Sequence, residues 1–212
     1  MRVDIWSDIV CPWCYVGKRR FEKALATFEH RQDVQIVHRS FQLDPRSPRG
    51  QTVDRKQMLQ QKYGWSTIQV QQADAQMTQL AAAEGLDYKL GGGVTGNTMD
   101  AHQVVHLARE RGLQDKVLER LYKAHFVDQQ SIFERETLVA LGTETGLDTA
   151  DIRDAVARDA FAEAVARDNT EARELGANGV PFFVVDHKLA VSGAQAVDVF
   201  GRALAQAAGI LP

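Results

Sequence analysis

The chain has 212 residues, of which 25 are basic and 28 acidic, and its formal net charge is −3. This charge gives no reason to expect a nucleic acid or an anionic membrane as a partner. The apolar runs are too short to cross a bilayer, and Met1 leads into a strand-like segment and not into a signal-peptide pattern. Two cysteines are too few for a structural disulfide framework, so we expect a cytoplasmic protein.

The first 43 residues predict a strand, a helix and a second strand. Val3–Trp6 is a short apolar stretch, and apolar residues recur at helical spacing from Pro12 to about Phe28. The second strand is predicted over residues 34–43. The Pro-, Arg- and Gly-rich stretch that follows, residues 44–50, is typical of a crossing between subdomains.

Residues 54–158 carry only helical signals. Two serines are followed three residues later by Gln or Glu, which is the spacing of a capping box. They are Ser66 with Gln69 and Ser131 with Glu134. Apolar stripes at helical spacing run through residues 101–108 and 118–125. The glycine-rich stretch at residues 90–94 is predicted to be a loop and not a strand.

The last segment, residues 159–212, returns to mixed structure. A helix is predicted to end near Gly176, and two short strands, 182–185 and 189–191, are joined by an Asp186-His187 turn. A final helix is predicted from about Gln195 to Ala208. The order along the chain is therefore βαβ, a helical block, and αββα.

Cys11-Pro12-Trp13-Cys14 carries the chemistry, and it contains the only cysteines of the chain. A Cys-x-x-Cys in the first turn of a helix that follows a strand is a redox dithiol pattern. The free N–H groups and the dipole of the helix terminus favour a thiolate on Cys11, which is the reactive form. Cys14 lies one turn further on, so one sulfur can attack a disulfide and the other can resolve the mixed disulfide.

Three groups of residues resemble the DsbA-like family, and within it the cytosolic FrnE-like branch. They are Ser7–Gly17 around the dithiol, Asn97-Thr98 with Ala101-His102, and Gly179–Val184 with Val191–Gln195. The resemblance implies an α/β thioredoxin fold with an inserted α-helical domain. The thioredoxin-like domain would comprise residues 1–50 and 159–212, and the inserted domain residues 51–158.

The resemblance also implies roles for single residues. Pro181 matches the cis-proline that faces the dithiol in the family, and a cis bond would leave the backbone of Val180 available to an extended substrate. Pro12 and Trp13 would tune the dithiol, with Trp13 exposed at its rim. Further expected substrate-binding residues are Asn97, His102, Ser192 and Gly193.

The same architecture occurs in 2-hydroxychromene-2-carboxylate isomerases and kappa-class glutathione transferases, which typically carry Ser at the position of Cys11. The dipeptide between the cysteines is Pro-Trp here, whereas the periplasmic oxidants of the family have Pro-His. A Trp has no cationic form, which favours a moderate redox poise.

Other interpretations of single residues remain open. Cys11 and Cys14 could be half of a zinc site, although no second cysteine pair exists. His102 and His106 have the spacing of a helical metal pair but lack an obvious third ligand. Asp8 would raise the pKa of a nearby thiol, or it could be a surface group. The Ser192-Gly193 step could hold an anion or cap the last helix.

The sequence thus predicts a thiol–disulfide oxidoreductase, working as a disulfide reductase or isomerase. Its substrate would be a disulfide-bearing protein or peptide, or a small thiol, and glutathione or a cellular dithiol would recycle it. No metal or nucleotide cofactor is implied, and the oligomeric state is open between monomer and homodimer. The alternatives are a glutathione-dependent isomerase or transferase for a small aromatic substrate, and a binding module that needs no cysteine.

Overall fold

A computed structural model describes residues 1–211 of the chain. The chain forms two compact units, one from Met1–Leu43 together with the segment from Ala166 on, and one from Asp44–Val165. The first unit is thus built from the two ends of the chain, as in a fold that carries an insertion. No helix in the described range 1–211 is both long enough and apolar enough to span a membrane.

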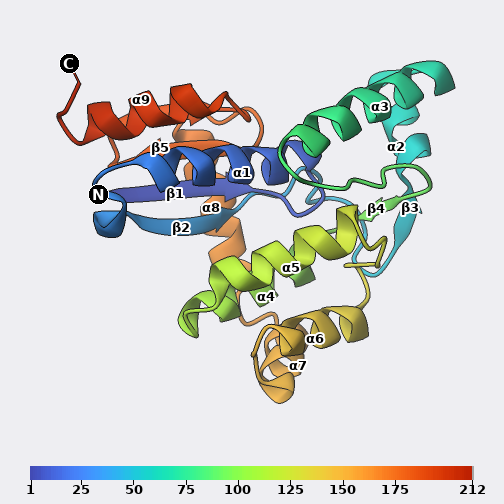
Figure 1. The fold of residues 1–212 in the computed structure, drawn as a ribbon. Coiled ribbons are helices and arrows are strands. Elements are labelled where there is room, and N and C mark those ends of the chain that lie inside the picture. Colours follow the sequence, from blue (N-terminus) through green and yellow to red (C-terminus); the bar gives the residue numbers. More distant parts are fainter. Residues whose placement is uncertain (212) are drawn as a thin grey trace. The chain divides into compact units, whose positions relative to one another are not determined.

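The first unit is built on a four-stranded sheet in the order β2-β1-β5-β6 (Figure 1). Its strands are β1 (Arg2–Ser7), β2 (Gln35–Ser40), β5 (Phe182–Val185) and β6 (Leu189–Ser192). β1 pairs with β2 in parallel, while β1–β5 and β5–β6 are antiparallel. This mixed sheet is the thioredoxin-type α/β fold that the sequence predicts.

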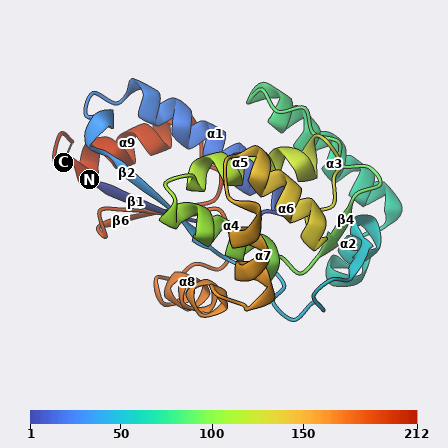
Figure 2. The same ribbon diagram turned by 90° about the horizontal axis from the view of Figure 1, so that it is seen from below.

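Helices cover both faces of this sheet. The helices α1 (Pro12–Thr27) and α9 (Val197–Ala207) lie on one face, and α8 (Ala162–Glu174) lies on the other (Figures 1 and 2). Alternate residues of a strand point to opposite faces, so Val3 and Ile5 of β1 pack on the α1/α9 side and Trp6 packs on the α8 side. Phe21, Phe183 and Phe200 lie at the centre of the α1/α9 side.

A buried ion-pair cluster joins α8 to the sheet. Arg39 of β2 donates through Nε to Asp4 of β1 at 2.8 Å and through Nη1 to Asp168 of α8 at 2.9 Å. The second carboxylate oxygen of Asp168 accepts from the Ser40 backbone N–H at 2.9 Å. Hydrogen bonds to Asp4, together with the nearby charges of Asp168 and Asp4, raise the pKa of Arg39, although its partial burial opposes this shift. The shared guanidinium compensates two buried carboxylates, whose burial without a paired charge would be costly.

The second unit contains six helices and a small two-stranded sheet within residues 44–165. The helices are α2 (Arg55–Tyr63), α3 (Thr67–Ala83), α4 (Met99–Glu110), α5 (Gln114–Phe126), α6 (Arg135–Glu144) and α7 (Thr149–Ala157). The helices α4 to α7 pack on one another, and α2 and α3 form a separate pair beside the small sheet (Figure 1). This sheet consists of the antiparallel strands β3 (Thr52–Asp54) and β4 (Val94–Gly96).

Two predictions for this unit are wrong. Val94 lies in a strand, because Thr52–Asp54 pairs with Val94–Gly96 across some forty residues of sequence. Ser131 does not cap a helix, because α6 begins only at Arg135, with Glu134 in the N-cap position and no side-chain cap. The capping box at the start of α3 is confirmed. The Ser66 side chain accepts from the Gln69 N–H, and the Gln69 side chain accepts from the Ser66 N–H.

Two differences in the first unit are smaller. The second strand ends at Ser40, short of the predicted Leu43. The last helix begins at Val197 and not at Gln195. In the turn between β5 and β6, Asp186 and His187 both have positive φ, 53° and 54°, as the two central residues of a type I′ turn do. The Lys188 N–H closes this turn on the Val185 carbonyl at 3.0 Å.

Candidate active site

The dithiol lies where β1 leads into α1, as predicted. The N–H of Cys11 donates to the Asp8 carbonyl at 3.1 Å, which closes a turn before the helix, and Cys11 itself is the N-cap residue. Pro12 occupies the first helical position, where its missing N–H would have had no partner in the helix. No side chain caps this helix, so the first-turn N–H groups are oriented toward the Cys11 end.

Both cysteines are free thiols, and both are buried. Cys11 is 5% exposed and Cys14 is 2% exposed. Burial raises the pKa of Cys14 well above its ordinary value, and its hydrogen bond to Cys11 and negative charge on Cys11 add to that increase. Cys14 therefore keeps its proton at neutral pH while Cys11 is reduced.

Asp8 is a buried carboxylate at the dithiol and not a surface group. It is 1% exposed, and its Oδ2 accepts a hydrogen bond from the Leu43 N–H at 2.8 Å. The charge of Asp8 makes a smaller contribution that also raises the pKa of Cys14, whereas a backbone hydrogen bond from Asp8 acts in the opposite direction. The interpretation of Asp8 as an influence on a thiol is thus supported for Cys14.

The Val180–Pro181 peptide bond is cis, as the resemblance implies. The Cys11 Sγ lies 3.5 Å from the Val180 carbonyl oxygen and donates to it. This contact places the proline segment directly beside the Cys11 sulfur, although the two are separated by some 170 residues in the chain. In the reduced protein, the Val180 carbonyl therefore accepts a hydrogen bond from the Cys11 thiol. The sequence analysis had expected this carbonyl to be available to an extended substrate.

Trp13 lies at the exposed rim of the site. Its side chain is 43% exposed, as predicted, and Leu43, whose N–H is bound to Asp8, is 39% exposed. Two large apolar side chains on different segments thus reach solvent near one dithiol, where an apolar chain can contact them. Sequence reasoning missed Leu43, because nothing local marks a residue three positions beyond the end of β2 as a neighbour of the Cys11 turn.

Ser192 and Gly193 lie next to the proline segment. The Gly193 N–H donates to the Pro181 carbonyl at 2.8 Å, and the glycine adopts φ +82°, a conformation that other residues rarely take. Ser192 ends β6, and Ala196 is the N-cap of α9, so the interpretation of the Ser192-Gly193 step as a helix cap is wrong. Both residues hold the backbone around Pro181.

Asn97 and His102 belong to the helical unit. The Asn97 amide nitrogen donates to the carbonyls of Pro45 and Ser47, and its oxygen accepts from the Met99 N–H. Asn97 thereby fastens the proline-rich stretch to the start of α4, and this stretch belongs to the helical unit. His102 is 2% exposed within α4. Their expected role at the dithiol stays a prediction.

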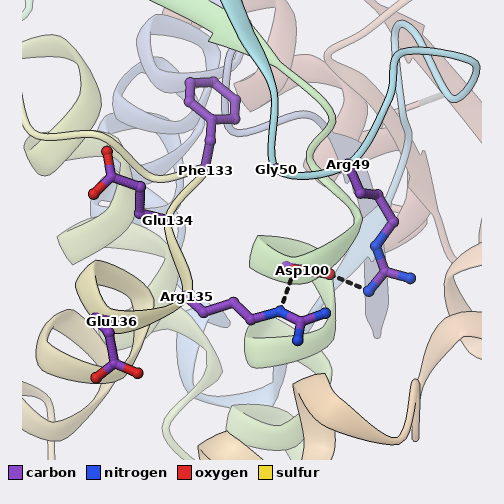
Figure 3. A pocket seen from close by; sticks show the side chains of 7 residues that line it. All are labelled: Arg49, Gly50, Asp100, Phe133, Glu134, Arg135 and Glu136. Atoms are coloured by element: carbon purple, nitrogen blue, oxygen red, sulfur yellow. Dashed lines mark hydrogen bonds and ion pairs between the residues drawn. The ribbon is translucent and has the colours of Figure 1, made fainter.

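The helical unit also contains a cavity of about 420 Å³ that includes none of the predicted site residues (Figure 3). Ion pairs cross its wall, where Arg49 and Arg135 both reach the carboxylate of Asp100. Arg49 is also bound to Asp159, and this hydrogen bond is the main reason that the Asp159 pKa is lowered. These contacts hold the loop at residue 49 against α4.

Comparison with known proteins agrees with this geometry. The model of the DSBA-like thioredoxin domain matches residues 2–205. A probable DsbA oxidoreductase from Streptomyces coelicolor is 49% identical, with a TM-score of 0.95 over 100% of this chain and 92% of the other. The uncharacterized protein YwbO of Bacillus subtilis (strain 168) is 26% identical over 96% of both chains.

A more distant structure shares the fold. The cytosolic disulfide reductase DsbM from Pseudomonas aeruginosa is 18% identical, with a TM-score of 0.70 over the whole of both chains. The family match covers nearly the whole length, and the free dithiol and the cis-proline lie side by side. The chain therefore belongs to the DsbA-like thioredoxin domain family of thiol–disulfide oxidoreductases.

Proposed function

We propose that this protein reduces or isomerises disulfides in polypeptides, with Cys11 as the attacking residue and Cys14 as the resolving residue. The observation that carries the proposal is the position of the Cys11 sulfur. It lies at an uncapped helix N-terminus and 3.5 Å from the carbonyl of Val180, while Cys14 is held as a thiol beneath it. A thiolate at such a terminus is stabilised by the free N–H groups and by the helix dipole.

In the first step the Cys11 thiolate attacks one sulfur of the substrate disulfide. A bond forms between Cys11 and that sulfur, the substrate S–S bond breaks, and the other substrate sulfur leaves as a thiolate that takes up a proton. Cys11 then carries no charge and no longer accepts a hydrogen bond from Cys14. Two of the causes that raise the Cys14 pKa have thereby disappeared.

In the second step Cys14 loses its proton and attacks the Cys11 sulfur. The Cys11–Cys14 disulfide forms, the bond between Cys11 and the substrate sulfur breaks, and that sulfur is released as a thiolate that takes up a proton. The substrate has gained two electrons from the dithiol and two protons, and the balance of protons is one from Cys14 and one from solvent. Two molecules of glutathione, or one cellular dithiol, restore the reduced form and become a disulfide themselves. The order of attack thus follows from the different surroundings of the two thiols.

Around the dithiol, Trp13 and Leu43 offer apolar contacts to the substrate chain. The backbone of Val180 can pair with an extended segment once Cys11 has formed the mixed disulfide. These features favour a polypeptide over a small thiol as the substrate. The cytosolic disulfide reductase that shares the fold is consistent with a reducing role in the cytoplasm.

The test is insulin reduction with glutathione as the electron source. Cys11→Ala should abolish turnover, because no sulfur remains to attack. Cys14→Ala should stop after the first step and accumulate a mixed disulfide between Cys11 and insulin, which mass spectrometry detects. Wild-type turnover by Cys11→Ala would refute Cys11 as the attacking residue. No insulin reduction by the wild-type protein would refute the proposal and favour a binding module that needs no cysteine.

A further inference from the structure

We propose that Gly17 and Arg20 of α1 are positioning residues that set where the Val180–Pro181 segment lies relative to the Cys11 sulfur. The inference rests on the proposed function, since it assigns these two residues a part in presenting the substrate to the dithiol. Neither residue touches Cys11. Both act through the segment that does.

Gly17 permits a close approach between α1 and the proline segment. A Cβ at this position would lie 2.8 Å from the Pro181 Cγ and 3.4 Å from the Ala194 Cβ. The shorter distance is one that real Cβ atoms essentially never show, and a proline ring cannot rotate away from the contact. Gly17 lies inside the helix and not in the positive-φ region. A glycine in a helix interior is destabilising relative to alanine, so the space that it leaves for Pro181 is its structural reason.

Arg20, three residues further along α1, binds the loop next to the same segment. Its Nη1 donates to the Ala194 carbonyl at 2.7 Å. One residue earlier, the Gly193 N–H donates to the Pro181 carbonyl at 2.8 Å. A continuous set of contacts therefore runs from Arg20 through residues 193–194 to Pro181. From there it reaches the Val180 carbonyl, which accepts from Cys11.

The two residues act in a complementary way. Gly17 sets how closely Pro181 can approach α1, and Arg20 keeps the loop at Ala194 against the same helix. Cys11 lies at the N-terminal end of α1, so one rigid helix carries the attacking sulfur and also locates the segment that receives the substrate. A displacement of about 1 Å in such an arrangement can lower the rate of a reaction on the order of a hundred-fold.

Another helix offers matched controls for both residues. Gly201 is a glycine within α9 that has open space where a Cβ would be added. Arg202 pairs with Asp198 one turn away, and its side chain is 64% exposed. Substitutions at Gly201 and Arg202 make the same glycine-to-alanine and arginine-to-glutamine changes away from the proline segment.

The experiment compares Gly17→Ala with Gly201→Ala, and Arg20→Gln with Arg202→Gln. For Gly17→Ala we expect kcat/KM for insulin reduction to fall by about ten- to a hundred-fold. Alkylation of Cys11 by iodoacetamide should not fall below the wild-type rate, because that small reagent does not need the Val180–Pro181 segment and a displaced Val180 carbonyl no longer engages the sulfur. Arg20→Gln should likewise lower insulin reduction while Cys11 alkylation is retained. Arg20→Lys should recover part of the insulin reduction, because a lysine can still donate to the Ala194 carbonyl. Gly201→Ala and Arg202→Gln should match the wild type in both assays.

A readout independent of turnover separates this inference from the proposed function. Amide hydrogen exchange at Gly193, whose N–H is bound to Pro181, should become faster in Gly17→Ala and Arg20→Gln, while exchange in β1 stays unchanged. Unchanged exchange at Gly193 would overturn the inference even if wild type reduces insulin. Faster exchange in a protein that reduces no disulfide would uphold the positioning and reject only the proposed function. An equal loss of insulin reduction and Cys11 alkylation would also overturn it, because it would indicate general disruption of the fold.

Discussion

In the proposed mechanism, the surroundings of Cys14, including the buried Asp8, determine when the resolving sulfur becomes available. Burial is the largest cause of the raised Cys14 pKa, followed by the hydrogen bond to Cys11 and the negative charge there, with the charge of Asp8 making a smaller contribution. Burial and Asp8 persist through the reaction, whereas the contribution of Cys11 ends once it joins the mixed disulfide. Cys14 is therefore protected from premature ionisation and becomes more reactive when it is needed.

A prediction at this scale concerns Asp8→Asn in a Cys11→Ser background, where Cys14 is the one remaining thiol. A neighbouring negative charge disfavours the thiolate, so removing it should lower the Cys14 pKa. The midpoint of the pH profile for iodoacetamide alkylation should move to lower pH, and alkylation at neutral pH should become faster. The midpoint should stay above the ordinary thiol value, because Cys14 remains buried.

The Asn side chain can still accept the hydrogen bond from Leu43, so the local geometry should persist. Asp33→Asn, at an exposed carboxylate, is the control and should leave the profile unchanged. A midpoint that stays in place or rises in the Asp8 variant would show that the charge of Asp8 does not act on Cys14.

At the scale of elements, the Arg39 cluster determines how three segments pack. It joins β1, β2 and α8, although α8 is more than 120 residues away from both strands in sequence. The Trp6 indole N–H adds a bond to the Asp168 carbonyl at 2.9 Å. The helix α8 precedes β5, so this cluster holds the C-terminal part of the chain against β1 and β2.

Arg39→Met should therefore destabilise the protein. Asp4 and Asp168 would remain buried with less compensation, and removing one partner of a buried ion pair costs about 3 kcal/mol or more. Urea unfolding should show a lower midpoint with an unchanged slope. Arg202→Met removes a highly exposed partner and should change the free energy of unfolding by no more than about 0.5 kcal/mol. Equal effects of the two substitutions would contradict a structural role for the cluster.

For the whole molecule, the reduction potential of the dithiol depends on how strongly the fold stabilises the reduced cysteines. A dithiol is a strong oxidant when its thiolate form is strongly stabilised. Here Cys14 is disfavoured as a thiolate, and the residue between the cysteines that faces solvent is Trp13, which carries no charge. We therefore expect a poise suited to reduction or isomerisation.

Equilibration of the dithiol in a glutathione redox buffer tests this expectation. The potential should fall between about −270 and −180 mV, the interval spanned by thioredoxin and protein disulfide isomerase. Trp13→His should make the disulfide more oxidising, because an imidazolium next to Cys11 stabilises its thiolate, whereas Trp13→Phe should have little effect. A wild-type value near about −120 mV would show that the protein is an oxidant.

Local patterns in the sequence determined the elements and the chemistry. The dithiol, the start of α1 and the capping box of α3 depend on contacts within four residues, and the spacing of residues displays such contacts directly. The family was recognisable for a related reason, since its characteristic residues cluster in three short segments, and the match over residues 2–205 confirms it.

The tertiary structure decided which distant segments meet. No local signal pairs Thr52–Asp54 with Val94–Gly96, brings Leu43 to Asp8, or places Pro181 where a Cβ on Gly17 would lie. A strand of three residues is too short for its alternation to be visible, and a glycine shows which atoms approach it only after the chain has folded. The identity of a side chain thus determines which interactions a residue can make. Long-range packing determines which other residue it makes them with.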